Sequence, residues 1–126
     1  MIQTPFINDV ARPMLTSEMI DQYIGLLEDF EYVITCSDIR DALFSKEGIK
    51  LPNRKDCFLA AAPEAYRMHI LEKYFDRFSE VDFAALQLPT DIKGYYNYNF
   101  KTNHKLTYME DLQIVEMLLD LQQGVK

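Results

Sequence analysis

The 126-residue sequence has few glycines and prolines, and its apolar runs are short. Four glycines and five prolines exclude collagen-like and low-complexity chains. The longest wholly apolar run, residues 57–63, is far shorter than the ~20 residues of a membrane-spanning helix. Residues 1–13 contain no basic stretch followed by an apolar one, so we expect no secretory signal peptide. Glycine-rich phosphate loops, G-x-S-x-G and H-E-x-x-H motifs are also missing, so no common enzyme class is indicated.

Cysteine is scarce as well. Cys36 and Cys57 do not form a C-x-x-C pair, and small secreted domains usually carry more cysteines. We therefore expect a cytoplasmic protein. Both residues lie in apolar surroundings, which predicts two buried free thiols.

The sequence is rich in apolar residues, which make up 48% of it and include eight tyrosines and eight phenylalanines. That content supports a packed core and excludes intrinsic disorder. A chain of this length fits one domain, so residues 1–126 are predicted to form a single domain. Pro5 and Pro13 disfavour a helix at the start, which predicts an extended N-terminal arm over residues 1–15.

Acidic residues outnumber basic ones by twenty to thirteen, giving a formal charge of −7. The balance is −5 over residues 1–50, +1 over residues 51–105 and −3 over residues 106–126. An acidic surface repels phosphate and attracts basic partners, so binding of duplex DNA is disfavoured.

The spacing of apolar residues predicts a mainly α protein, a compact bundle of about five helices. A small strand or hairpin near residues 94–106 is expected because tyrosine and phenylalanine alternate there with asparagine. An α+β arrangement is the alternative. The predicted helices cover residues 17–34, 38–46, 53–62, 63–79, 81–86 and 107–123.

The last predicted helix has an unusually wide apolar stripe. Thr107 and Glu110 form a T-x-x-E capping box at its start. The stripe indicates either the centre of a helical core or an interface, and a homo-oligomer through residues 108–121 is one form of that interface.

The segment of residues 93–105 interleaves aromatic rings with lysines. Three interpretations are open: an ordinary packed strand, a protein contact, or a single-stranded nucleic-acid site in which bases stack on the rings. The residues of the nucleic-acid alternative are Lys93, Tyr95, Tyr96, Tyr98, Phe100, Lys101 and Lys105.

The favoured hypothesis is a small non-catalytic module that binds a basic protein surface, such as an inhibitor, immunity-type protein, adaptor or accessory factor. We predict no catalytic residue, metal site or cofactor, because His69, Glu72 and Asp76 share a helix face without a second ligand cluster. The candidate protein-binding residues are Glu28, Asp29, Glu31, Tyr95, Tyr96, Tyr98, Phe100, Glu110, Asp111, Glu116 and Asp120.

Overall fold

The structure is a computed structural model that describes residues 5–51 and 53–124, and it contains a four-stranded sheet. The strand order is β1-β3-β2-β4, in which β3 is antiparallel to β1 and β2 while β4 runs parallel to β2. The elements, in chain order, are β1 (Phe6–Ile7), α1 (Ser17–Leu26), β2 (Tyr32–Asp38), the 3-10 helix η1 (Arg54–Asp56), β3 (Phe58–Tyr66), α2 (Met68–Tyr74), the 3-10 helix η2 (Ala84–Gln87), β4 (Gly94–Asn97) and α3 (Asp111–Gln122).

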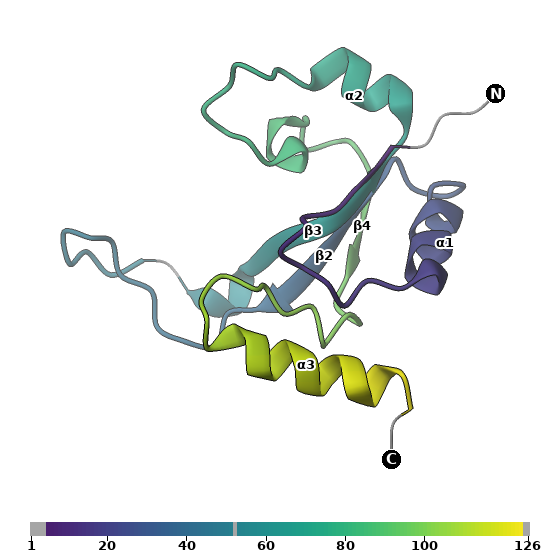
Figure 1. Cartoon of the computed structure of the whole chain (residues 1–126). Coiled ribbons are helices and arrows are strands. Elements are labelled where there is room, and N and C mark those ends of the chain that lie inside the picture. Colours follow the sequence, from purple (N-terminus) through teal and green to yellow (C-terminus); the bar gives the residue numbers. More distant parts are fainter. Residues whose placement is uncertain (1–4, 52, 125–126) are drawn as a thin grey trace.

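Helices cover both faces of the sheet (Figure 1). On one face α1 packs through Tyr23 and Leu27 against Val33 and Ala65. The other face carries a second cluster, which α2 and η2 cover; its buried members are Tyr32, Ile34, Cys36, Tyr66 and Ala84. The chain is therefore an α/β protein, and the predicted mainly α bundle is wrong. The α+β alternative also missed the parallel pairing of β2 with β4.

The central strand β2 explains the first error. A single helix was predicted over residues 17–34. In the structure α1 ends at Leu26, and the strand β2 begins at Tyr32. Residues 32–36 are all buried, because β2 lies between β3 and β4 and both of its faces are covered. A strand buried on both faces has a continuous apolar run instead of alternation. That run resembled the end of a helix.

The strand β3 replaces two further predicted helices, over residues 53–62 and 63–79. Pro63 lies inside β3 after a cis peptide bond, not at a helix start. Only Met68–Tyr74 is helical in the second range. The predicted helix over residues 38–46 is also absent; this stretch belongs to a long segment that projects from the sheet (Figure 1).

The remaining elements lie closer to their predicted places. A 3-10 helix, η2, stands near the predicted turn at residues 81–86. The strand expected near residues 94–106 is β4, although it does not form a hairpin. In the predicted N-terminal arm, residues 5–15 contain the short strand β1, whereas Met1–Thr4 lie outside the described residues.

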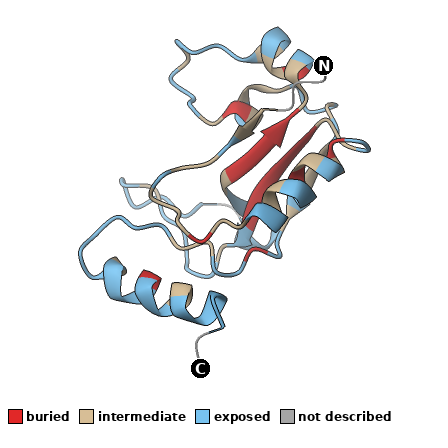
Figure 2. Ribbon diagram, turned by 45° about the vertical axis from the view of Figure 1, so that its right-hand side comes forward, coloured by how far each residue is buried: buried red, intermediate tan, exposed pale blue. Residues whose placement is uncertain are grey.

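The helix α3 does not form the centre of the core. It lies across one end of the sheet, and most of its surface is exposed (Figure 2). Val115 is its buried residue, while Met117 and Leu121 are more than 60% exposed. The core interpretation is thus wrong, and self-association through residues 108–121 stays a prediction.

A chain of side-chain hydrogen bonds joins α1 to three strands. Asn97 Nδ2 on β4 donates to Tyr23 Oη at 2.9 Å, and Tyr23 Oη lies 2.5 Å from Thr35 Oγ1. Thr35 Oγ1 in turn donates to the Pro63 carbonyl at 2.8 Å. Each buried hydroxyl therefore has partners, which removes the cost of burying it.

Glu64 is a buried carboxyl on β3 whose hydrogen-bond partner is the Tyr66 hydroxyl, at 2.6 Å. Burial raises the pKa of Glu64 above its ordinary value of 4.5, although the bond from Tyr66 opposes that rise. The folded state therefore favours the protonated acid. Stability from this site is present below pH 4.5 and is lost as the pH rises through the raised pKa.

We expect Glu64→Gln to be more stable than the wild type at pH 8 and to lose that advantage at pH 4. Urea denaturation at pH 4, 6 and 8 measures the difference. Glu72→Gln, on the exposed side of α2, is the matched control and should track the wild type. A Glu64→Gln advantage that does not depend on pH would contradict this account.

Among residues 5–51 and 53–124, no helix has both the length and the apolar character that a membrane crossing requires.

Candidate functional site

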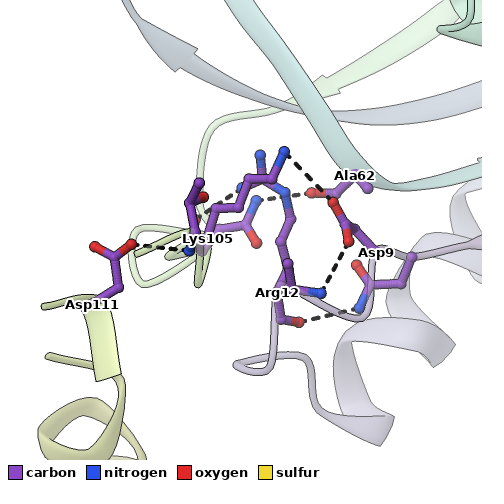
Figure 3. A network of polar contacts seen from close by, with 9 residues as sticks. Asp9, Arg12, Ala62, Lys105 and Asp111 are labelled. Atoms are coloured by element: carbon purple, nitrogen blue, oxygen red, sulfur yellow. Dashed lines mark hydrogen bonds and ion pairs between the residues drawn. The ribbon is translucent and has the colours of Figure 1, made fainter. Parts of the chain in front are cut away.

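A cluster of polar side chains joins the loop after β1 to the segment before α3 (Figure 3). These segments are about ninety residues apart in the sequence: an Arg12 guanidinium nitrogen donates to the Asn103 carbonyl at 3.2 Å. The Leu106 amide donates to the Ala11 carbonyl at 2.6 Å. We call the following set the polar cluster: Asn8, Asp9, Arg12, Asn103, His104, Lys105 and Asp111.

Asp9 and Lys105 form an ion pair at the surface of the cluster. Lys105 Nζ lies 3.8 Å from Asp9 Oδ2, and both side chains are more than one-third exposed. The other carboxylate oxygen of Asp9 accepts from the Ala11 amide at 2.9 Å, which fixes the orientation of the carboxylate. An exposed ion pair of this length is weak. A charged ligand can therefore replace either partner at little cost.

A cavity of about 370 Å³ adjoins the cluster. Arg12, Arg40 and Lys101 line it, with Asp38 as the single acidic residue in its wall. Arg54 stands beside it, since its guanidinium donates to the Arg40 carbonyl at 2.8 Å. In a chain with a net charge of −7, this local excess of positive charge favours an anionic ligand.

The cluster also contains buried acceptors without a partner. The amide nitrogen of Asn103 donates to the Ala62 carbonyl at 2.9 Å, and that of Asn8 donates to the Arg12 carbonyl at 3.2 Å. The side-chain oxygens of both asparagines are buried and have no hydrogen-bond partner among the residues that the structure describes. Asn103 also lines the cavity, so one of these unsatisfied acceptors belongs to a residue of the cavity wall.

The cysteines supply no nucleophile to this site. Cys36 lines the cavity, but burial raises the pKa of its thiol to about 11, so the thiol is protonated at neutral pH. Its predicted burial is confirmed. The prediction for Cys57 is wrong, because that residue is exposed between η1 and β3.

The structure separates the acidic residues that we predicted to bind a partner. Glu28, Asp29 and Glu31 lie in the turn between α1 and β2, at the end of the sheet away from α3 (Figure 1). Glu110, Glu116 and Asp120 are exposed on or beside α3. Asp111 belongs to the polar cluster, where its carboxylate accepts two backbone hydrogen bonds.

The aromatic segment does not form one stacking surface. Tyr95 packs edge-on against Phe30 on the α1 face, whereas Tyr96 contacts Phe58 on the opposite face. Phe100 is buried. The lysines are also dispersed: Lys93 lies over the Phe30 ring at 4.9 Å, Lys101 lines the cavity and Lys105 pairs with Asp9.

Sequence reasoning missed most of the cluster. It selected Lys105 and Asp111 for other roles and passed over Asn8, Asp9, Arg12 and Asn103. The signal available was a polar group, Asn8 with Asp9, directly after an apolar pair. Nothing in the sequence alone places that group beside residue 105.

Comparison with known proteins finds cytidylyltransferases among the relatives of this chain. No known family model matches it. The sequence is 26% identical over 125 residues to the bifunctional ribulose 5-phosphate reductase/CDP-ribitol pyrophosphorylase Bcs1 of Haemophilus influenzae, covering 89% of this chain and 26% of that protein. It is 30% identical over 124 residues to the 2-C-methyl-D-erythritol 4-phosphate cytidylyltransferase of Clostridium botulinum strain Loch Maree, covering 90% of this chain and 54% of that enzyme.

Solved structures of such enzymes share the fold. The 2-C-methyl-D-erythritol 4-phosphate cytidylyltransferase of Francisella tularensis superposes with a TM-score of 0.75 at 22% identity, over 91% of this chain and 58% of that chain. The enzyme of the same name from Thermus thermophilus gives a TM-score of 0.66 at 17% identity, over 91% of this chain and 61% of that chain. The chain spans about half the length of the cytidylyltransferases it matches.

These similarities correct our functional prediction. The relatives in sequence are enzymes, which overturns the non-catalytic protein-binding module, its nucleic-acid alternative and the expectation of no enzymatic role.

Proposed function

We propose that this chain forms the acceptor-binding part of a cytidylyltransferase that acts on a polyol phosphate. The single observation that carries the proposal is the cation-lined cavity beside the polar cluster, in a chain whose relatives are named for ribitol and methylerythritol phosphate chemistry. Ribitol and methylerythritol phosphates share one dianionic group and several hydroxyls. The wall of the cavity offers partners for both kinds of group.

The phosphate is the stronger determinant of binding. Arg12 and Lys105 both belong to the polar cluster, and Arg12 lines the cavity together with Arg40 and Lys101. Guanidinium groups bind phosphate through paired N–H donors, whereas lysine acts as a point charge. Lys105 is expected to leave Asp9 for the incoming phosphate, because the two are only weakly paired.

The hydroxyls have their own partners. Ser37 and Asp38 at the end of β2 line the cavity, as does Asn103. Hydroxyl groups both donate and accept hydrogen bonds, so a polyol chain suits this mixed wall. A planar apolar ligand would leave these polar groups without partners.

The transfer itself needs no covalent intermediate with the protein. An oxygen of the polyol phosphate forms a bond to the α-phosphorus of CTP while the bond to the β-phosphate bridging oxygen breaks, and pyrophosphate leaves with that electron pair. Positioning and charge neutralisation supply most of the catalysis in phosphoryl-transfer reactions. The role of Arg12 and Lys105 is to hold the attacking phosphate and offset its charge.

Nucleotide transfer commonly uses Mg²⁺, which proteins bind through one or two carboxylates together with substrate phosphates. The described residues contain no group of three His, Cys, Asp or Glu side chains that could hold a metal by themselves. The cluster fits the shared mode, in which Asp9 would supply the carboxylate. When bound there, the ion would neutralise charge on the phosphates.

Isothermal titration calorimetry of the 126-residue chain tests the proposal. We expect ribitol 5-phosphate to bind and ribitol to bind at least about tenfold more weakly. The affinity for inorganic phosphate should lie between those two affinities. Equal binding of ribitol and ribitol 5-phosphate, or no binding of either, would contradict the proposal.

A further inference from the structure

The segment that carries Lys105 is held in place by contacts instead of by regular structure. Residues 103–107 form neither helix nor strand. At the beginning of the segment, Asn103 bonds to the Ala62 carbonyl and accepts from Arg12. In its middle, the Leu106 amide bonds to the Ala11 carbonyl.

Asp111, the first residue of α3, fixes the other end of the segment. Its Oδ2 accepts from the Tyr108 amide at 2.7 Å and from the Thr107 amide at 2.9 Å, while its Oδ1 lies 3.1 Å from His104 Nε2. The bonds from Tyr108, Thr107 and His104 lower the pKa of Asp111 below its ordinary value, so it is ionised at neutral pH. The expected capping box of Thr107 with Glu110 is replaced by this arrangement.

His104 and Lys105 are consecutive, and they contact partners on different sides of the segment. Lys105 reaches Asp9, in the loop after β1, whereas His104 reaches Asp111 on α3 (Figure 3). If His104 were free to rotate away, the backbone that aims Lys105 would lose one of its few fixed points. Because one peptide unit joins the two residues, a contact that fixes the backbone at His104 also limits the backbone conformation at Lys105.

We propose that His104 and Asp111 form a positioning pair that holds Lys105 in the orientation needed to bind the acceptor phosphate. The pair touches neither the ligand nor the reacting atoms, and it acts through Lys105. This inference rests on the proposed function insofar as the ligand of Lys105 is a phosphate. It assigns α3 the role of anchoring the binding segment.

A double-mutant cycle in the 126-residue chain tests the link. His104→Ala is expected to weaken binding of ribitol 5-phosphate about fivefold, the effect of losing one hydrogen bond. In the Lys105→Met background the same change should have no further effect, because the residue that it positions is gone. Equal losses in both backgrounds, or no loss in either, would overturn the proposal.

Two further variants separate positioning from folding. His104→Gln keeps a side-chain donor for Asp111 and should recover most of the lost affinity. His69→Gln, at the other histidine of the sequence on the exposed side of α2, should bind as the wild type does. The midpoint of thermal unfolding is measured for each variant, and the His104→Ala loss should persist at temperatures where that variant is fully folded. A loss that disappears there would overturn the proposal.

A measurement without ligand keeps this inference distinct from the proposed function. We expect the Leu106 amide, which bonds to the Ala11 carbonyl, to exchange with deuterium faster in His104→Ala than in the wild type. If the wild type binds no phosphate ester but this exchange still accelerates, the proposed function fails and the positioning of the segment stands. An unchanged exchange rate overturns the positioning pair whatever the ligand.

Discussion

Lys105→Met is expected to lower the affinity for ribitol 5-phosphate by about 10- to 100-fold, which corresponds to losing one charge-assisted bond. Within residues 5–51 and 53–124 the side chain pairs with Asp9 alone, at 3.8 Å, and more than half of its surface is exposed. Its removal therefore leaves no buried charge behind. We expect the free energy of unfolding to change by less than about 0.5 kcal/mol. Calorimetric titration and urea denaturation measure the two quantities.

Lys73→Met is the control for this variant. It makes the same chemical change on the exposed side of α2, where Lys73 lies over the Tyr74 ring. Its affinity for ribitol 5-phosphate should equal that of the wild type. If both lysine variants lose affinity equally, the attraction is a general effect of charge and the cluster is not the site.

Gly94→Ala is expected to destabilise the fold by about 2–3 kcal/mol, the usual cost of forcing atoms into a packed core. Gly94 begins β4 and stands opposite Tyr32 on the parallel strand β2. A Cβ at this position would overlap the Tyr32 ring. That ring is buried and stacks on Tyr66, so it has no free space into which to move. Chemical denaturation of both proteins at pH 7 measures the loss.

Gly25→Ala is the matched control, since it makes the same change in the last turn of α1. Apart from the backbone of its own helix and its chain neighbours, no described atom lies within 4 Å of the added Cβ, and the glycine does not need a positive φ. Alanine is the better helix former, so this variant should be stabilised by about 0.5–1 kcal/mol. If Gly94→Ala were as stable as Gly25→Ala, the close packing of β4 on Tyr32 would be wrong.

The sequence allowed the first and last helices to be recognised better than the sheet. Thr16 caps the first helix, because its hydroxyl accepts from the Met19 amide at 3.2 Å. The apolar stripe of the last helix was also recognised. Both signals are local, because capping and helical periodicity involve residues within four positions.

The two central strands could not be found in the same way. Residues 32–36 and 63–66 are buried on both faces, so their pattern shows no alternation that distinguishes a strand from a buried helix. Their identity depends on pairing with each other, which is a tertiary property. Tyr96, by contrast, alternates with asparagines on an edge strand, and β4 was located from that pattern.

The candidate site was hidden for a related reason. Asp9 with Lys105, and Arg12 with Asn103, are each separated by more than ninety positions, and no local pattern joins them. The overall charge of −7 also misdirected the functional prediction. It describes the average surface, whereas the cavity wall gathers Arg12, Arg40 and Lys101 in one place.

The most direct test of the central claim is to map the bound ligand by NMR. Titrating ribitol 5-phosphate into the ¹⁵N-labelled chain should shift the amide signals of Arg12, Lys101, Asn103 and Lys105. Signals from the groove between α1 and β4, which Gln22 and Tyr95 line, should not move. Shifts confined to that groove, or the same shifts with ribitol alone, would contradict a phosphate site at the polar cluster.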